Sequence, residues 1–258
     1  MKQEHIVSVD QGLCIKCGAC EKDCVFRVMV LTERGAEVTS PECAKCGHCV
    51  AVCPQHAVSI SGYEDEPEEI RPELKLAPEV LTAAIKSRRS MRFFTDREVT
   101  KEDIEKIIEA GRFVPTARNY QGTSYIVLKE NIEEYEKIVV SALRRLKKLI
   151  NPFLGRYKQL EVDDNFFFKG APVAIVIKSN DVIDGALAAS IMELMAQSLG
   201  LGVLYSGFFT AAVKLPGKLR RRLSIPRGDK IVTTLVIGHP AVTYKRTVQR
   251  ESARVSYN

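Results

Sequence analysis

The chain has 258 residues, 45% of them hydrophobic, which is enough for one large or two modest domains with a packed core. No apolar run reaches the roughly 18 residues of a membrane span, and the N-terminal residues lack the charged-then-apolar pattern of a signal peptide. We therefore expect a soluble, cytoplasmic protein. The net charge of +6 is uneven: residues 1–61 carry −1, residues 62–79 carry −5 and residues 80–258 carry +12. The basic last segment suits a phosphate-bearing cofactor or nucleic acid.

All eight cysteines lie in two runs of identical spacing near the N-terminus. Each run reads Cys-x2-Cys-x2-Cys-x3-Cys, the first from Cys14 to Cys24 and the second from Cys43 to Cys53. Thiolates are soft ligands that favour iron–sulfur or zinc sites. This spacing matches the bacterial iron–sulfur pattern, in which the fourth cysteine of each run ligates the other cluster.

Two other interpretations of the cysteines fit less well. Zinc sites normally use paired Cys-x2–4-Cys knuckles separated by longer gaps, and disulfides would need an exported chain. The duplicated run instead resembles two-cluster bacterial ferredoxins over residues 5–61. The resemblance implies two [4Fe-4S] clusters, cluster 1 held by Cys14, Cys17, Cys20 and Cys53, and cluster 2 held by Cys43, Cys46, Cys49 and Cys24.

Short strands and sharp turns are expected around these cysteines. Gly18 and Gly47 follow the second cysteine of each run, where a tight turn is easiest without a Cβ. Residues 6–9 and 58–61 can pair as strands, and residues 25–38 would form a connecting hairpin. Such a module needs little hydrophobic core because the clusters replace one.

Residues 62–78, GYEDEPEEIRPELKLAP, are acidic and hold three prolines. This composition cannot bury much apolar surface, so we expect a linker. It separates a two-cluster domain at residues 1–61 from a second domain at residues 79–258.

The second domain alternates helix and strand patterns, which predicts an α+β fold. Helices are expected from Val80 to an end near Ser87–Ser90, after the capping box Thr100–Asp103, over 131–149, over 182–199 behind Asp181, and around 216–223. Strands are expected over 124–129, 172–178 and 230–238. The small and apolar residues of 182–199 suit burial on several faces, including a subunit interface.

Three segments of the second domain carry a family resemblance when they are taken together and in order. They are Arg88–Phe94 (RRSMRFF), Val114–Gln121 (VPTARNYQ) and Gly238–Pro240 (GHP). The set resembles the nitroreductase family of FMN enzymes across residues 79–250. The resemblance implies a mixed sheet flanked by helices, and a homodimer with FMN in the subunit interface. An N-terminal two-cluster ferredoxin module is a known arrangement in this family.

The resemblance also implies which residues bind the flavin phosphate. A phosphate needs forked guanidinium donors and hydroxyls, and the matching positions are Arg88, Arg89 and Ser90, joined by Lys245 or Arg246. Taken alone, an Arg-Arg-Ser sequence at a helix end is more often a solvated C-terminus.

Other matching positions would contact the rest of FMN. Arg92 would meet the pyrimidine end of the flavin, and the amides of Asn119 and Gln121 the ring or ribityl edge. Thr116 and Asn119 would reach across from the other subunit, and the backbone at Ser206 and Gly207 would approach the reactive flavin nitrogen. Without the resemblance, Asn119 and Gln121 read as ordinary loop residues.

These features favour an FMN oxidoreductase in which the clusters relay single electrons, from a donor such as ferredoxin, into FMN. The acceptor would be a small electron-poor molecule such as a nitroaromatic, a quinone or an activated alkene, and no residue is assigned as catalytic acid or base. Phe166–Phe168 and Tyr157 are expected to shape the acceptor pocket. Exposed low-potential clusters suggest an anaerobic microbe.

Three alternatives stay open. In the first, the flavin takes electrons from NAD(P)H and the clusters export them. In the second, the protein is a non-enzymatic electron carrier. In the third, it is a redox-responsive binding protein. Nucleic acid is not expected as a partner, because no aromatic residues interleave with the basic clusters at 144–148 and 220–222.

Overall fold

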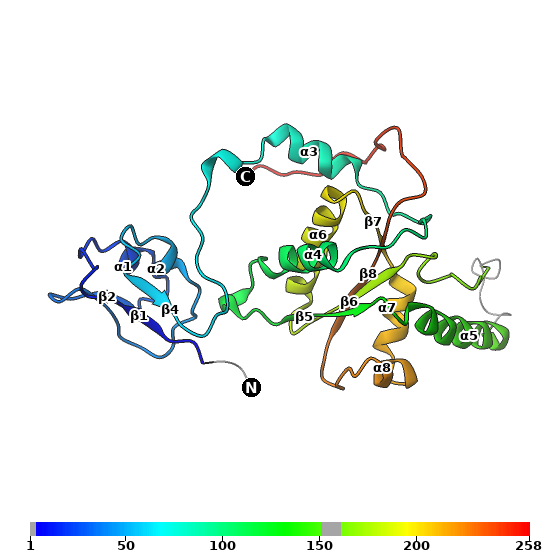
Figure 1. Cartoon of the computed structure of the whole chain (residues 1–258), viewed down its shortest axis with the longest axis horizontal. Helices are drawn as coiled ribbons and strands as arrows, with labels where there is room; N and C mark the ends of the chain where they lie inside the picture. Colours follow the sequence, from blue (N-terminus) through cyan, green and yellow to red (C-terminus); the bar gives the residue numbers. More distant parts are fainter. Residues whose placement is uncertain (1–3, 151–160) are drawn as a thin grey trace. The chain divides into compact units, whose positions relative to one another are not determined.

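The computed structural model describes residues 4–150 and 161–258. Contacts divide the chain into two compact units, which Figure 1 shows coloured along the sequence. The first unit comprises Met1–Lys75 together with Thr116–Tyr120, and the second comprises Leu76–Pro115 together with Gln121–Asn258. Most of the acidic segment 62–78 is therefore grouped with the first unit. Thr116–Tyr120, which the sequence assigns to the second domain, is grouped with it as well.

The first unit contains the two strand pairs that the sequence predicts. Strand β1 (Val7–Val9) lies antiparallel to β4 (Val58–Ile60), and β2 (Met29–Leu31) forms a hairpin with β3 (Ala36–Val38). Each run has a short helix that contains its third cysteine, α1 (Ala19–Asp23) with Cys20 and α2 (His48–Ala51) with Cys49. A 3-10 turn, η1, at Pro72–Leu74 lies near the end of this unit's main segment.

The backbone of this unit repeats itself. Gly18 and Gly47 are the N-cap residues of α1 and α2, and both lie in the left-handed region. The positive φ angles recur in the same order in each run, at Lys16 (59°), Gly18 (70°) and Arg27 (51°), then at Lys45 (52°), Gly47 (79°) and His56 (51°). The two cysteine runs therefore fold as two copies of one local structure.

The hydrophobic core of the first unit is small. Its buried members are Cys20, Met29, Ala36 and Val58, and four partly buried cysteines and four partly buried valines pack around them. Cysteines therefore make up much of the packed interior of this unit. This agrees with the expectation that the clusters replace a core.

The second unit is built on a four-stranded sheet in the order β5-β6-β8-β7. Its strands are β5 (Thr123–Leu128), β6 (Val173–Ser179), β7 (Gly202–Tyr205) and β8 (Ile231–Gly238), and neighbouring strands are antiparallel. Ser90 adds a parallel bridge to Val203 at the β7 edge. The α+β fold class is confirmed.

Helices cover both faces of this sheet (Figure 1). Val173, Ile175 and Ile177 of β6 pack with α4 (Lys101–Arg112) and α6 (Val182–Ser198). Ala174 and Val176, which point the opposite way, pack with α5 (Ile132–Ile150), α7 (Gly207–Lys214) and α8 (Lys218–Arg222). Burial on both faces explains why β6 reads as a continuous apolar run.

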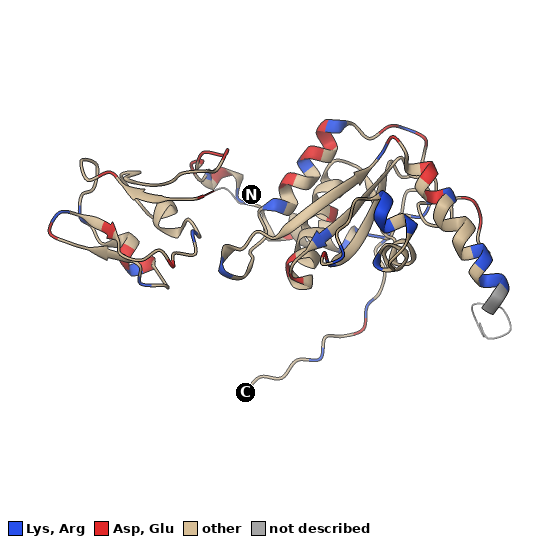
Figure 2. Ribbon diagram, turned by 90° about the horizontal axis from the view of Figure 1, so that it is seen from below, with Lys and Arg blue, Asp and Glu red and all other residues tan. Residues whose placement is uncertain are grey.

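Local signals set the helix ends. The Thr100 hydroxyl accepts the Asp103 N–H at 3.1 Å, and the Asp181 carboxylate accepts the Ile183 N–H at 2.7 Å, so both predicted caps are confirmed. In α5 the first turn is acidic and the last is basic (Figure 2), which suits the helix dipole. None of the helices in the described ranges is long and apolar enough to cross a bilayer.

Two features of the second unit differ from expectation. Helix α7 was not predicted, and α3 (Pro78–Ser87) forms as predicted but buries none of its residues in the single chain. Phe166, Phe167 and Phe168 are 8%, 3% and 2% exposed within the core beside α5 and α7, so they fill the interior and do not line an open acceptor pocket. Tyr157 lies outside the described residues.

The buried carboxylate of Glu136 on α5 holds the phenylalanine segment in place. Its two oxygens accept the N–H groups of Phe167 at 2.7 Å and Phe168 at 2.8 Å. Burial raises the pKa of Glu136, while these two N–H groups act in the opposite direction. The carboxylate thus satisfies two buried donors where no strand or helix partner does.

Replacing Glu136 with Ala should lower the free energy of unfolding by about 2–4 kcal/mol, because two buried N–H groups lose their acceptor. Urea denaturation measures the change. The matched control is Glu133→Ala on the same helix, whose side chain is 86% exposed and should change stability by no more than about 0.5 kcal/mol. Equal effects for the two variants would contradict the role given to Glu136.

Candidate functional site

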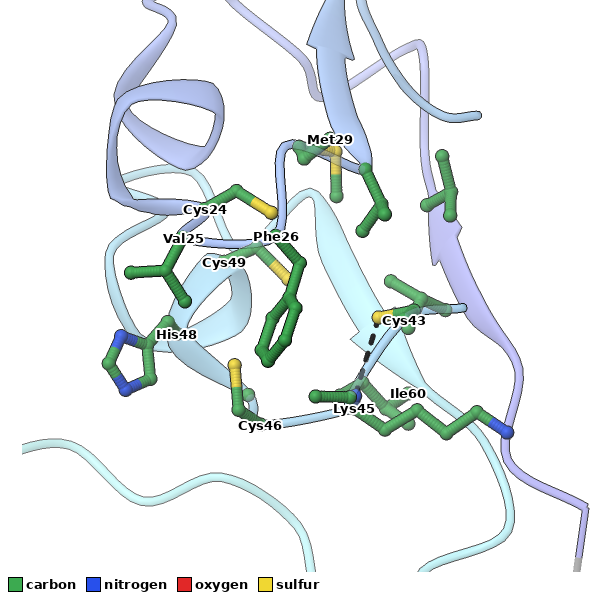
Figure 3. A pocket seen from close by; sticks show the side chains of 15 residues that line it. Cys24, Val25, Phe26, Met29, Cys43, Lys45, Cys46, His48, Cys49 and Ile60 are labelled. Carbon is green, nitrogen blue, oxygen red and sulfur yellow. Dashed lines mark hydrogen bonds between the residues drawn. The ribbon is translucent and has the colours of Figure 1, made fainter. Parts of the chain in front are cut away.

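Two cavities in the first unit are each lined by four cysteines. The cavity in Figure 3 is lined by Cys24, Cys43, Cys46 and Cys49, whose sulfur atoms point toward one another. The other cavity is lined by Cys14, Cys17, Cys20 and Cys53. In both cavities the fourth cysteine comes from the other run, so the structure brings together the same two sets that the sequence assigns to the clusters.

Backbone N–H groups point at several of the sulfur atoms. The Lys45 N–H donates to Cys43 Sγ, and the Ala57 N–H donates to Cys53 Sγ, each at 3.3 Å. Backbone hydrogen bonds from Ala36 and then Lys16 lower the pKa of Cys14. These donors favour the thiolate form, which is the form that binds metal.

Burial acts in the opposite direction on the more enclosed thiols. Loss of solvation raises the pKa of Cys49 to about 11 and also raises the pKa of Cys20. Without a metal these two side chains are protonated at neutral pH. Binding of metal must therefore displace their protons and would supply the positive charge that a buried thiolate needs.

The shape of the two cavities suits a group larger than a single ion. No three or more His, Cys, Asp or Glu side chains within residues 4–150 and 161–258 converge closely enough to hold one metal ion. In a [4Fe-4S] cluster each iron takes one thiolate, so the four sulfurs must surround a volume. The cavity in Figure 3 is also lined by apolar side chains, including Phe26, Met29 and Ile60.

In the second unit the structure brings two of the three flavin-related segments together. The Met91 N–H donates to the Val203 carbonyl at 2.9 Å, which attaches the segment 88–94 to the edge strand β7. At its other end the Ala241 N–H donates to the Phe93 carbonyl, also at 2.9 Å. The segments Arg88–Phe94 and Gly238–Pro240 thus lie side by side.

Two glycines make this close approach feasible. A Cβ at Gly202 would lie 2.7 Å from Met91 Cγ, and a Cβ at Gly238 would lie 2.9 Å from Phe94 Cδ1. Contacts this short do not occur between real Cβ atoms and their neighbours. Glycine is therefore required where segment 88–94 crosses the ends of β7 and β8.

Arg88, a predicted phosphate ligand, is held by a polar network. Its Nη1 lies 2.7 Å from Glu193 Oε2, which also accepts the Tyr205 hydroxyl at 3.2 Å. Burial, followed by the charge of Glu193, raises the pKa of Tyr205. Within the described part of the chain, the buried Arg88 Nε has no hydrogen-bond partner. A phosphate oxygen would satisfy this donor.

The sequence analysis missed Glu193 and Tyr205. The available signal was the single charged residue in the stretch IMELMAQS of α6, because a charge on a mostly apolar helix needs a partner. Its partner, Arg88, lies 105 positions away in the sequence, so no spacing rule could identify it.

The remaining predicted flavin residues lie in different surroundings. Gly207 begins α7, and a Cβ there would meet no protein atom within 4 Å, whereas Ser206 is buried and its hydroxyl donates to the Phe167 carbonyl at 2.9 Å. Arg89 is half-buried, and the others in this unit are exposed: Ser90, Arg92, Gln121, Lys245 and Arg246.

Thr116 and Asn119 belong to the first unit. The turn η2 (Ala117–Asn119) follows Thr116, and the Asn119 amide Nδ2 donates to the Lys45 carbonyl at 2.8 Å. The structure therefore does not group these two residues with Arg88 and Gly238. Their role toward a flavin stays a prediction.

Comparison with known families finds separate matches for the N-terminal segment and for the rest of the chain. Residues 85–239 match the nitroreductase family model, and residues 13–58 match a model described as a 4Fe-4S dicluster domain. The first match covers more than half of the chain.

Individual relatives agree with these matches. A putative NADH dehydrogenase/NAD(P)H nitroreductase of Methanothermobacter thermautotrophicus is 32% identical over 167 residues, which are 61% of this chain and 76% of that protein. A ferredoxin of Pyrobaculum islandicum is 41% identical over 59 residues, 22% of this chain and 54% of that protein. Among solved structures, a nitroreductase with bound FMN from Bacteroides fragilis superposes with a TM-score of 0.56 at 20% identity, covering 69% of this chain and 98% of that one. This last likeness concerns the fold alone.

Replacing Gly202 with Ala should displace segment 88–94 from the β7 edge and lower the free energy of unfolding by about 1–3 kcal/mol, the usual effect of overpacking. Thermal unfolding measures the stability, and limited proteolysis within segment 88–94 measures its displacement. The control is Gly228→Ala, where an added Cβ would meet nothing within 4 Å. Wild-type stability and protection in Gly202→Ala would refute the close-approach argument.

Proposed function

The chain belongs to the nitroreductase family, and on that premise we propose that it is an FMN-dependent oxidoreductase with two [4Fe-4S] clusters. The clusters would relay electrons, from a donor such as ferredoxin, to FMN for reduction of a small electron-poor acceptor. Nitroaromatics, quinones and activated alkenes are the acceptor classes. The observation that carries the proposal is the pair of four-cysteine cavities in the same chain as a nitroreductase-family domain.

The cysteines supply the ligands of both clusters. Cys14, Cys17, Cys20 and Cys53 would hold cluster 1, and Cys43, Cys46, Cys49 and Cys24 would hold cluster 2. Each set lines one cavity, which supports the count of two. The N–H donors at Cys43 and Cys53 would stabilise the negative charge on the cluster sulfurs.

FMN would lie along segment 88–94, and the nitroreductase of Bacteroides fragilis with a similar fold carries bound FMN. Two features of the second unit fit the cofactor: the unsatisfied Arg88 Nε, which suits a phosphate, and the open space over Gly207 at the start of α7. Arg89, Ser90 and either Lys245 or Arg246 would add donors to the phosphate, and Arg92 would meet the pyrimidine end.

When bound, the clusters carry single electrons and FMN exchanges either one electron or two. The residues of this chain would bind and orient these groups. The Arg88–Glu193–Tyr205 network keeps the Arg88 guanidinium in one orientation before the phosphate arrives, which reduces the entropy lost on binding. No side chain is assigned to proton transfer.

The chain would act as a homodimer. Helix α6 leaves apolar side chains exposed along its length, Ile183 at 69%, Leu187 at 41% and Ile191 at 41%. Helix α3 likewise leaves Val80, Leu81 and Ile85 exposed. Surfaces of this kind mark protein–protein interfaces, and a second copy of the chain is the partner that the family favours.

A second candidate function uses NAD(P)H as the electron donor, with the clusters carrying electrons away. The relative from Methanothermobacter thermautotrophicus, named as an NAD(P)H nitroreductase, favours this alternative. The two candidates differ in where electrons arrive, and a kinetic experiment separates them.

Anaerobic stopped-flow absorbance of the purified protein should show fast flavin bleaching by reduced ferredoxin and slow bleaching by NADH or NADPH. In a Cys14→Ala variant, bleaching by ferredoxin should become slow, because one cluster is lost, whereas dithionite should still reduce the flavin fully. Fast bleaching by NADH or NADPH alone would establish the second candidate function. Ferredoxin-driven bleaching that survives the loss of both clusters would exclude the relay.

Replacing Arg246 with Ala should weaken FMN retention about 10-fold or more, since a hydrogen bond between charged groups is lost. Arg88→Ala should have at least the same effect, because it also removes the partner of Glu193. Fluorescence titration of the flavin-free protein with FMN measures both. Arg250→Ala is the matched control, as an exposed arginine in the same C-terminal segment but outside the predicted set, and retention equal to this control in both variants would remove the phosphate assignment.

A further inference from the structure

A side chain predicted to bind flavin instead contacts the loop between two cysteines. Asn119 lies in turn η2, within the first unit, and its Nδ2 donates to the Lys45 carbonyl at 2.8 Å. Lys45 stands between Cys43 and Cys46, both of which line the cavity assigned to cluster 2. This hydrogen bond joins residues 74 positions apart, so the loop depends on a segment far outside the cysteine runs.

Lys45 connects this bond to a sulfur atom. Its own N–H donates to Cys43 Sγ at 3.3 Å, the dashed line in Figure 3. Lys45 has a φ of 52°, a left-handed conformation that residues other than glycine rarely adopt. The N–H and the carbonyl of one residue are linked through only two rotatable bonds. A partner that holds the carbonyl therefore also restricts the direction of the N–H.

A second contact attaches the same turn to the same cavity. The Arg118 guanidinium lies 5.6 Å from the centre of the Phe26 ring, and Phe26 lines the cluster 2 cavity. Arg118 and Asn119 are themselves left-handed, with φ angles of 52° and 53°. Consecutive residues in this conformation persist only where surrounding contacts hold them. The contacts with Phe26 and Lys45 do so here.

The first cysteine run has a comparable arrangement with a different amide. Gln11 Nε2 donates to the Ala36 carbonyl at 2.9 Å, and a backbone hydrogen bond from Ala36 reaches Cys14. Ala36 lines the cavity assigned to cluster 1. In each half of the unit an amide side chain thus holds the carbonyl of a residue whose N–H faces a cysteine sulfur.

We propose that Asn119 is a positioning residue of cluster 2, which holds the Lys45 backbone so that its N–H stays on Cys43 Sγ and thereby raises the reduction potential of that cluster alone. The proposal rests on the clusters of the proposed function. Hydrogen bonds to cluster sulfurs raise the potential, because reduction adds negative charge that the donors stabilise. Gln11 has the matching role at cluster 1.

The test compares Asn119→Ala with Gln11→Ala in the full-length protein carrying its clusters. Anaerobic potentiometric titration, monitored by electron paramagnetic resonance, gives the midpoint potential of each cluster, and iron and FMN contents are measured on the same samples. Asn119→Ala should lower the potential of one cluster and leave the other unchanged. Gln11→Ala should lower the potential of the other, and the double variant should lower both.

A second substitution guards against simple loss of folding. Asn119→Asp keeps the shape of the side chain but sets a carboxylate against the Lys45 carbonyl, so it should lower the same potential at least as far as Asn119→Ala does. Selective loss of about half of the iron, with the second cluster signal retained, would also support the proposal.

Three results would overturn the proposal. The first is that both potentials stay at their wild-type values in Asn119→Ala and Asn119→Asp. The second is that Asn119→Ala and Gln11→Ala change the potential of the same cluster. The third is that only the FMN content falls. The last result would return Asn119 to the flavin. Absence of any iron–sulfur signal from the wild-type protein is distinguishable from these, since it would remove the proposed function as well.

Discussion

The constraint on which the first unit depends is the proximity of four thiol groups in each of two cavities. Burial raises the pKa of Cys49 and Cys20, so these thiols favour the neutral form until a cation compensates their charge. Few other buried side chains hold this unit together, because its core is limited to residues such as Met29, Ala36 and Val58. The same sulfurs that would ligate the clusters are therefore the ones that would stabilise the fold, so cofactor binding and folding would be coupled.

The second unit reaches its site by different means. A sheet buried on both faces provides a rigid support. Backbone hydrogen bonds attach segment 88–94 to Val203 of the edge strand β7 and to Ala241, which follows β8. Its position depends on the absence of two side-chain atoms, at Gly202 and Gly238. Rigid attachment fixes where the guanidinium of Arg88 points, and the Glu193 carboxylate then holds it there. Geometry of this kind is set by packing and not by the arginine motif itself.

The sequence predicted correctly those features that are determined by residues close together in the chain. Cysteine spacing, the caps at Thr100 and Asp181, and the apolar run of β6 all depend on neighbours within a few residues, and the structure contains each of them. Contacts between distant segments were not accessible. The pairing of Arg88 with Glu193, the burial of Phe166–Phe168 and the contact of Asn119 with Lys45 all depend on tertiary structure. An amide or an arginine in a loop has many equivalent partners, and only the fold selects among them.

The duplicated cysteine run raises the question of what would set the direction of electron transfer between the two clusters. Two identical cluster sites would have identical potentials, and electrons would have no energetic preference between them. In this chain the local backbone is repeated closely, yet the surroundings differ: Lys16 is exposed where its counterpart Lys45 is half-buried, and the outer amide comes from Gln11 in one copy and from Asn119 in the other. Because hydrogen bonding and solvent exposure both set cluster potentials, the unequal surroundings are sufficient to distinguish the two sites without any change in the ligands.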